Sequence, residues 1–338
     1  GVLKTVGVRI FALVVGVGLT ASSAQATTAA TAPAGFVRTS ITAGTPVRKA
    51  TSLVSTPLLN APVYSGRITR AGGTEAGEIV SQALGGAGLG CLEDERPYAV
   101  FVTSGTAAGF SFRVTGTTAR GLRVDCQGID LAQLLEAGDT FELRPLHTLS
   151  SLFGSTSAEV PFAASADPLR ADQLLVSRGG TWHAYWFTGT SWRRTGKAGD
   201  AGEDVLLPQD ALVVYRRGTD SLDVRFLGDA PATDAVVAVP AGVVSSVANP
   251  FPADVALAEL GLESVSGWQC GATPELADQV QLCLGNTWRT FWHDGSGWRC
   301  TSGADADATV PAGAGMIVVR KPAPSAAPFT WITRPYTL

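Results

Sequence analysis

The residues best suited to acid–base or metal chemistry in this chain of 338 residues are its three histidines, His147, His183 and His293. They show no spacing typical of metal ligands, and no Gly-x-Ser-x-Gly turn between a strand and a helix marks a nucleophilic serine. In two similar segments described below, His183 aligns with Arg289 and His293 with Phe187, so no histidine site is repeated. The sequence therefore predicts no catalytic residue, no cofactor and no metal ion, although folding can still assemble a Ser–His–Asp triad from distant positions.

Two groups of carboxylates are candidates for holding a cation. Residues 93–95 form a short acidic run that is typical of a solvated loop. A Ca²⁺ ion needs several oxygen ligands on a turning loop. The second group supplies Asp200, Glu203 and Asp204 in one segment and Asp305 and Asp307 in the other. Only Asp204 and Asp307 correspond, each four residues before a proline, so the pattern favours a turn ahead of a proline-led strand over a calcium site.

Six tryptophans carry the strongest signal in the sequence, an internal repeat. Two segments that begin Ala-Asp-Gln at Ala171 and Ala277 align without a gap through their tryptophans, and both end in an apolar strand, at 211–217 and 315–321. The aligned pairs are Trp182 with Trp288, Trp186 with Trp292, and Trp192 with Trp298. Three tryptophans at identical spacing rarely arise by chance, so we predict a duplicated, tryptophan-rich β-meander module.

The same tryptophans are the candidate ligand-binding residues. Strand alternation places Trp182 and Trp186 on one face and His183 and Tyr185 on the other. If the indoles are buried, each covers about 150–250 Å² and forms part of the module core. If they are exposed in a row, they form a platform that stacks on sugar rings. The spacing fits both alternatives, of which burial in the core is the more common.

Five cysteines follow the predicted export signal: Cys91, Cys126, Cys270, Cys283 and Cys300. Exported proteins meet oxidising surroundings, so disulfides are expected, and the odd number leaves at least one thiol free or paired with another molecule. We predict a Cys91–Cys126 bridge. Cys283 and Cys300 fall on the first and third strands of a meander, about 10 Å apart, whereas a disulfide needs Cα atoms closer than about 7 Å. Cys270 is therefore expected to pair with one of these two.

An N-terminal signal peptide is predicted for residues 1–26. Lys4 and Arg9 supply positive charge, residues 10–19 form an apolar run, and a small-residue cleavage site ends at Ala26. The apolar run is shorter than the roughly 20 residues that cross a bilayer. We expect cleavage, no membrane insertion afterwards, and an extracytoplasmic location that is secreted, periplasmic or on the cell surface.

The elements that must position these residues are strands rather than helices. The 39 glycines and 19 prolines favour many turns between short strands. Short apolar or β-branched runs, separated by turn residues, continue through most of the chain. Helical patterns are limited to residues 75–84, 131–136 and 254–260. The predicted fold class is therefore all-β.

We predict three folded parts after a flexible leader at residues 27–34. Residues 35–154 form an N-terminal β domain, and residues 155–240 and 241–338 form the two Trp-rich modules, packed as sandwich- or barrel-like units. The central strand of each module carries aromatic residues on both faces. Part of that surface is therefore expected to be buried against a neighbouring sheet.

Short motifs spread over nearly all of the chain carry a resemblance to a known family. They include Leu53-Val54-Ser55-Thr56-Pro57, Val63-Tyr64-Ser65-Gly66, Ala137-Gly138-Asp139 and residues 147–153, together with the two Trp…Asp…Pro modules. With these motifs the chain resembles a functionally uncharacterised family of secreted, β-rich bacterial proteins with Trp-containing repeated modules. The resemblance implies a secreted β architecture and no catalytic residues. The cysteines depart from the family's pattern, so their pairing rests on this chain alone.

The net charge and the lack of catalytic or metal-binding motifs together indicate which functions to expect. The net charge is −4, with no basic cluster, which argues against nucleic acid as a partner. We expect a non-enzymatic structural or surface-assembly protein, of the coat or appendage subunit type, that associates with itself or with other surface proteins. The alternative is a carbohydrate-binding protein whose exposed tryptophans hold a polysaccharide, and the second alternative is a secreted hydrolase.

Overall fold

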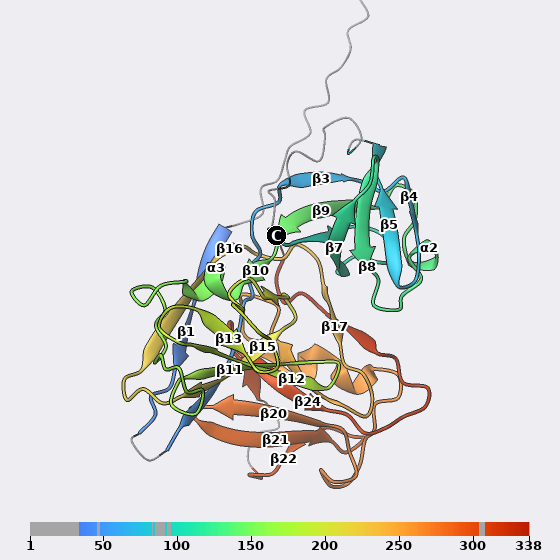
Figure 1. Ribbon diagram of the computed structural model, residues 1–338. Coiled ribbons are helices and arrows are strands. Elements are labelled where there is room, and N and C mark those ends of the chain that lie inside the picture. The colour runs from blue at the N-terminus through green and yellow to red at the C-terminus, as the bar shows by residue number, and fades with distance from the viewer. Residues whose placement is uncertain are drawn as a thin grey trace, which may run out of the picture. The chain divides into compact units, whose positions relative to one another are not determined.

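The fold is all-β, as the sequence predicts. The computed structural model describes residues 34–45, 48–82, 84, 92, 96–303 and 308–337. Strands make up 43% and helices 6% of the structure, and the strands form antiparallel sheets (Figure 1). The predicted signal peptide and residues 27–33 lie outside these ranges. Within them, no helix combines the length and apolar character that crossing a bilayer requires.

A seven-stranded antiparallel sheet has the order β3-β9-β6-β7-β8-β5-β4. Its strands are β3 (Tyr64–Arg67), β4 (Arg70–Gly72), β5 (Ala76–Val80), β6 (Tyr98–Val102), β7 (Ser111–Thr117), β8 (Gly121–Asp125) and β9 (Thr140–Pro145). Alternate residues enter one core, in which Phe112 and Phe141 are buried, and the short helix α2 (Leu131–Leu134) follows β8. Residues 75–84, predicted to be helical, contribute β5 instead. The sheet packs so closely there that a Cβ on Gly77 would lie 2.4 Å from Sγ of Cys126.

Two five-stranded sheets have the same strand order and form the centres of what we call the first and second lobes. The first, in the order β13-β12-β11-β15-β2, contains β2 (Ala50–Ser55), β11 (Gln173–Arg178), β12 (Thr181–Phe187), β13 (Trp192–Arg194) and β15 (Ala211–Arg216). The second, in the order β22-β21-β20-β24-β18, contains β18 (Val244–Ala248), β20 (Gln279–Leu284), β21 (Thr287–His293), β22 (Trp298–Cys300) and β24 (Gly315–Val319). Gly285 and Asn286, with φ of 57° and 64°, form a two-residue turn between β20 and β21.

Smaller elements also occupy corresponding places in the two lobes. The paired strands are β1 (Ala34–Ile41) with β16 (Leu222–Asp229), β17 (Ala235–Ala238) with β25 (Phe329–Ile332), β10 (His147–Thr148) with β14 (Val205–Leu206), and β19 (Val255–Ala256) with β23 (Thr309–Val310). A helical turn follows β10 and β19, namely α3 (Leu149–Phe153) and η2 (Leu257–Leu260). The N–H of Leu149 donates to the carbonyl of Asp204, and the N–H of Leu257 donates to that of Ala308. Ala308, rather than Asp307, therefore holds the place that Asp204 holds in the first lobe.

A buried carboxylate makes the same contacts in each lobe. Asp172 and Asp278 are 1% and 0% exposed. Asp172 pairs with Arg216, and Oδ2 of Asp278 lies 3.2 Å from Nε of Arg320. Each carboxylate also accepts the N–H of the residue after that arginine, at 2.6 Å in both lobes. These bonds tie the start of the meander to the end of its last strand.

The first two strands join the first lobe rather than the seven-stranded sheet that follows them in the chain. Although residues 35–154 are predicted to form one domain, β1 pairs with β16, and β2 pairs with β15. Their side chains Val37, Ile41 and Val54 are buried in the first-lobe core. The seven-stranded sheet lies between β2 and β10 in the chain, where the second lobe has only the connection 249–254 between β18 and β19.

The cysteines do not form the predicted bridge from Cys270. Cys126, Cys270, Cys283 and Cys300 are free thiols, and Cys91 lies outside the described residues. Cys283 and Cys300 point to opposite faces of their sheet. Cys283 faces the first-lobe sheet, where its Sγ donates to the carbonyl of Thr51 at 3.1 Å, whereas Cys300 is buried in the second-lobe core. Cys270 lies at the surface, so no pair of these thiols faces each other.

Brief alkylation of the folded protein is expected to modify Cys270 before Cys126, Cys283 and Cys300. Cys270 is exposed, whereas Cys126 and Cys300 are buried. Burial raises the pKa of the Cys283 thiol to about 11, and the thiolate is the reactive form. Peptide mapping by mass spectrometry after a short iodoacetamide pulse measures the order. Modification of Cys283 as fast as Cys270, or a disulfide that includes Cys270, would contradict this arrangement.

Candidate functional site

A cavity of about 470 Å³ lies where the seven-stranded sheet and the two lobes meet, and we call it the junction cavity. Its polar lining includes Arg113, Asp125 and Gln127 from the seven-stranded sheet, Ser177, Arg178 and Asp210 from the first lobe, and Ser245 and Ser246 from the second lobe. The ring of Phe329, on β25, adds an aromatic wall. Its volume falls in the range of small-molecule sites, which often form where domains meet.

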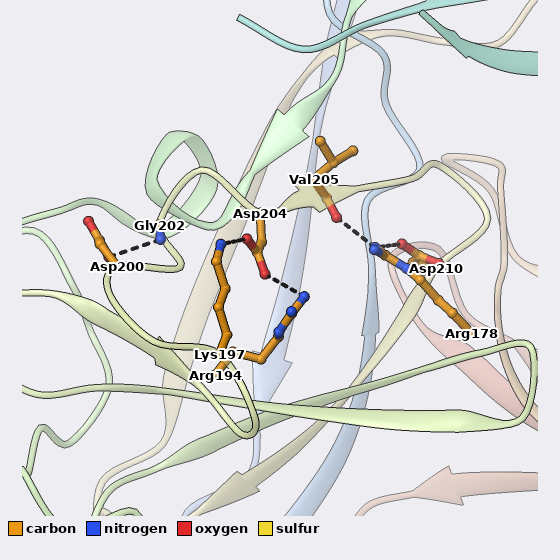
Figure 2. Close-up of polar contacts among 8 residues, drawn as sticks. All are labelled: Arg178, Arg194, Lys197, Asp200, Gly202, Asp204, Val205 and Asp210. Carbon is orange, nitrogen blue, oxygen red and sulfur yellow. Dashed lines mark hydrogen bonds and ion pairs between the residues drawn. The ribbon is translucent and has the colours of Figure 1, made fainter. Parts of the chain in front are cut away.

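An ion pair from the first lobe forms one wall of the junction cavity (Figure 2). Arg178 ends β11, and Asp210 directly precedes β15. The guanidinium of Arg178 donates to the Asp210 carboxylate and, at 2.6 Å, to the carbonyl of Val205. Asp210 also accepts the N–H of Leu207 at 2.8 Å. Burial acts to lower the pKa of Arg178, but the charge and hydrogen bond of Asp210 outweigh it, and the pKa is raised. Arg178 therefore stays charged.

A second charged group lies close to this pair, also in Figure 2. The carboxylate of Asp204 accepts from Arg194 at 3.0 Å and from Lys197. The carboxylate of Asp200 accepts the N–H of Gly202 at 3.0 Å. These carboxylates are therefore engaged by cations or backbone, and among the described residues no three His, Cys, Asp or Glu side chains form a group that could hold a metal ion. Asp305, Asp307 and residues 93–95 lie outside the described ranges.

The charges of this wall are absent from the corresponding places of the second lobe. Strand register and hydrogen bonding place Leu284 where the first lobe has Arg178, Ala314 where it has Asp210, Cys300 where it has Arg194, and Ala308 where it has Asp204. The second lobe thus builds the same strand arrangement with apolar residues. Replacing buried ion pairs by apolar residues is often neutral or stabilising. The second lobe therefore forms the same strand arrangement without these charges.

His183 and Tyr185 face the same charged group but remain uncharged near neutral pH. Burial lowers the pKa of His183, and the neighbouring Arg194 and Arg178 lower it further. Burial raises the pKa of Tyr185. Arg178 is therefore charged near neutral pH, and these two groups are neutral.

The other two histidines lie elsewhere. His147 sits between the carbonyl of Leu58, at 3.2 Å from Nε2, and the amide of Asn60, at 3.4 Å from Nδ1. Burial lowers the pKa of His147. Nδ1 of His293 accepts the N–H of Gly295 at 3.2 Å and lies 3.4 Å from Sγ of Cys270. Each histidine therefore has its own set of neighbours, and these contacts do not bring the three together.

The six tryptophans divide into three equivalent pairs with different exposure. Trp192 and Trp298 are 1% and 4% exposed and belong to the lobe cores. Trp186 and Trp292 are half-buried, and neither buried indole N–H has a hydrogen-bond partner among the described residues. Trp182 and Trp288 are 39% and 42% exposed. The row of three is therefore not one platform, and only the first tryptophan of each lobe offers a ring face to a ligand.

Trp182 is not one of the residues that line the junction cavity, but its cross-strand neighbour Ser177 is. It stands directly opposite Ser177 in the register of β11 and β12, and Ser177 lines the cavity. Directly opposed side chains share a face of the sheet, with Cβ atoms about 4.5–5.5 Å apart. Trp288, its counterpart, stands opposite Cys283, which does not line the junction cavity. The two exposed indoles thus occupy equivalent positions, but the residue opposite each one differs: Ser177 faces Trp182, and Cys283 faces Trp288.

Sequence reasoning identified Trp182 but missed the residues that line the cavity. One signal was available in the aligned segments. The first segment has Arg178, which lines the cavity, and Arg194, where the second has Leu284 and Cys300. A further signal appears only in three dimensions. Gln127 adopts a φ of 53°, an uncommon left-handed conformation for a residue other than glycine.

Comparison with family models, with curated proteins and with solved structures gives no match for this chain.

Proposed function

We propose that the protein is a non-enzymatic carbohydrate-binding protein, and that the junction cavity and Trp182 together hold a saccharide. The observation that carries the proposal is an indole that is 39% exposed and whose cross-strand neighbour Ser177 lines a polar cavity of about 470 Å³. A sugar ring has an apolar C–H face and a rim of hydroxyl groups. The indole suits the apolar face, and charged and amide side chains can donate to or accept from the hydroxyls.

The polar lining supports a saccharide over a highly charged ligand. Arg113 and Arg178 supply donors, Asp125 and Asp210 supply acceptors, and Gln127 supplies both. Positive and negative groups are therefore balanced around the cavity. Hydroxyl groups both donate and accept, so a polyhydroxylated ligand can use each of these partners.

The contacts that hold the carboxylates favour binding of a saccharide without its hydrolysis. Glycosidases generally use two carboxyl groups on either side of the scissile bond, one of which acts as an acid. Asp210 is held by Arg178 and by the N–H of Leu207, and Asp204 is held by Arg194 and Lys197. Asp210, which lines the cavity, is therefore held in an ion pair, and so is Asp204.

Replacing Trp182 with alanine is expected to weaken saccharide binding about tenfold or more, a loss of about 1.4 kcal/mol. Titration calorimetry with soluble oligosaccharides of glucose, N-acetylglucosamine and galactose identifies the ligand and measures its affinity. Trp288→Ala is the matched control, because that indole is similarly exposed but its cross-strand neighbour, Cys283, does not line the junction cavity. Equal losses in both variants, or no binding to any of the sugars by the unaltered protein, would refute the proposal.

Surface assembly is the second candidate function, favoured by a different face of the molecule. Phe36 and Leu227 are partners in the register of β1 and β16 and are 69% and 72% exposed. In the second lobe, Trp331 on the corresponding ribbon instead packs edge-on against Phe110 of the seven-stranded part, with ring centroids 5.4 Å apart. An extracytoplasmic location, supported by the predicted export signal, is compatible with both candidates.

A further inference from the structure

We propose that the free edge of β16 accepts the N-terminal leader of a second copy of this chain, residues 27–33, as an added β-strand. This inference goes beyond saccharide binding and gives the second candidate function a site and a partner. It rests on an unpaired strand edge, on the groove beside that edge, and on the place where the leader enters the fold.

The backbone of β16 has one paired and one free edge. The N–H of Leu59 donates to the carbonyl of Asp229 at 2.9 Å, and the N–H of Asp229 donates back to Leu59 at 2.7 Å. Asp229 thus directs its backbone groups away from β1. Backbone groups alternate in direction along an antiparallel strand, so Leu227 and Arg225 direct theirs to the same side. No hydrogen bond from the described residues reaches the backbone of Leu227 or Arg225.

A groove of about 620 Å³ runs beside this edge. Residues 225–227 form one wall, and Thr148 and Leu152, from β10 and α3, contribute to the other. An open edge of this kind is a template for another strand unless it is blocked. The adjoining Leu227 and Phe36 side chains, 72% and 69% exposed, form an apolar surface that strand addition would partly cover.

The leader suits the groove by composition and length. Residues 27–33 have the sequence Thr-Thr-Ala-Ala-Thr-Ala-Pro, with small side chains, none of which is charged. Extended at about 3.3 Å per residue, it spans about 23 Å, close to the length of β16 (Leu222–Asp229). Strand addition of this kind draws its affinity from backbone hydrogen bonds, so large anchoring side chains are not needed.

The entry point of the leader favours a second copy as its donor. The leader joins the fold at Ala34, which pairs with Asp229 at the end of β16. To lie on the free edge of its own β16, the leader would have to reverse direction at once and pass the bridge between Leu59 and Asp229. The leader of another molecule has no such constraint.

The test compares Arg225→Pro with Arg225→Ala in the chain that begins at Thr27, together with a chain that begins at Ala34. Proline removes the N–H that faces the free edge and is tolerated there. Alanine keeps it. Val224 and Phe226, which pair with β1, are unchanged, and circular dichroism and thermal unfolding confirm that each variant folds.

Light scattering over a concentration series measures the mass of each protein. We expect the unaltered chain and Arg225→Ala to associate as concentration rises, and Arg225→Pro and the chain without the leader to stay monomeric. A monomeric unaltered chain, or association that survives both changes, would overturn the inference. Saccharide binding is measured separately on the monomeric variants, so failure of one proposal leaves the other open to its own test.

Discussion

Replacing Asp278 with alanine is expected to lower the free energy of unfolding by about 3–5 kcal/mol, because it leaves a buried charge without its partner. Arg320 is 3% exposed as a residue, and its Nε lies 3.2 Å from Oδ2 of Asp278. The same carboxylate accepts the N–H groups of Gln269 at 3.0 Å and Lys321 at 2.6 Å. All three donors lose this acceptor at once, and water has no ready access to the site.

Urea unfolding followed by far-UV circular dichroism measures this change. Glu78→Ala is the control, because Glu78 belongs to an exposed ion pair with Arg70, and exposed pairs contribute about 0–1 kcal/mol. Asp172→Ala, which removes the corresponding carboxylate of the first lobe, should cost a similar amount to Asp278→Ala. A change below about 1 kcal/mol at Asp278 would mean that Arg320 finds another partner or reaches water.

Local patterns in the sequence predicted much of the two lobes. Alternation placed Tyr185 and Phe187 on the face opposite Trp182 and Trp186, and both are buried in the first-lobe core. The turn at Gly285 follows directly from residue type. These features depend on neighbours within a few residues, which a single sequence displays.

Features that depend on distant partners were not predicted. Residues 52–55 form a short run that predicts a strand, but nothing in them shows that the partner is 211–216, beyond the whole seven-stranded sheet. In the same way, Cys283 and Cys300 were predicted to be too far apart to pair, but the partner chosen for one of them lies at the surface. The residue pattern of a strand indicates which of its faces is buried, but it does not indicate which other strand pairs with it.

In the candidate site too, the local feature was predicted and the features that depend on distant residues were not. Trp182 was identified from spacing, whereas the junction cavity forms only where three parts of the chain meet. The charge of Arg178, which lines the cavity, and that of Arg194 are visible in the sequence as departures from the second segment. Their meaning becomes clear only when the corresponding positions, Leu284 and Cys300, are seen to occupy the same places in an equivalent sheet.

Asp210→Ala is expected to destabilise the protein by about 1.5–3 kcal/mol, the usual worth of hydrogen bonds to a charged group. The change removes the acceptor of Arg178 and of the N–H of Leu207. The double change Arg178→Leu with Asp210→Ala introduces the residues that the second lobe has in these places, Leu284 and Ala314. Because both charges are removed together, we expect stability to return to that of the unaltered protein or to exceed it.

The same two variants separate the structural from the functional part of the ion pair. If the charges serve ligand binding, both variants lose affinity for the saccharide, and the double variant does so while folding as well as the unaltered protein. Unfolding in urea and calorimetric titration of the same preparations supply the two measurements. If the double variant recovers stability and binding together, the pair has no part in the site. If it remains as unstable as Asp210→Ala, the first lobe needs the charges for its fold, and the comparison with the second lobe no longer supports a binding role.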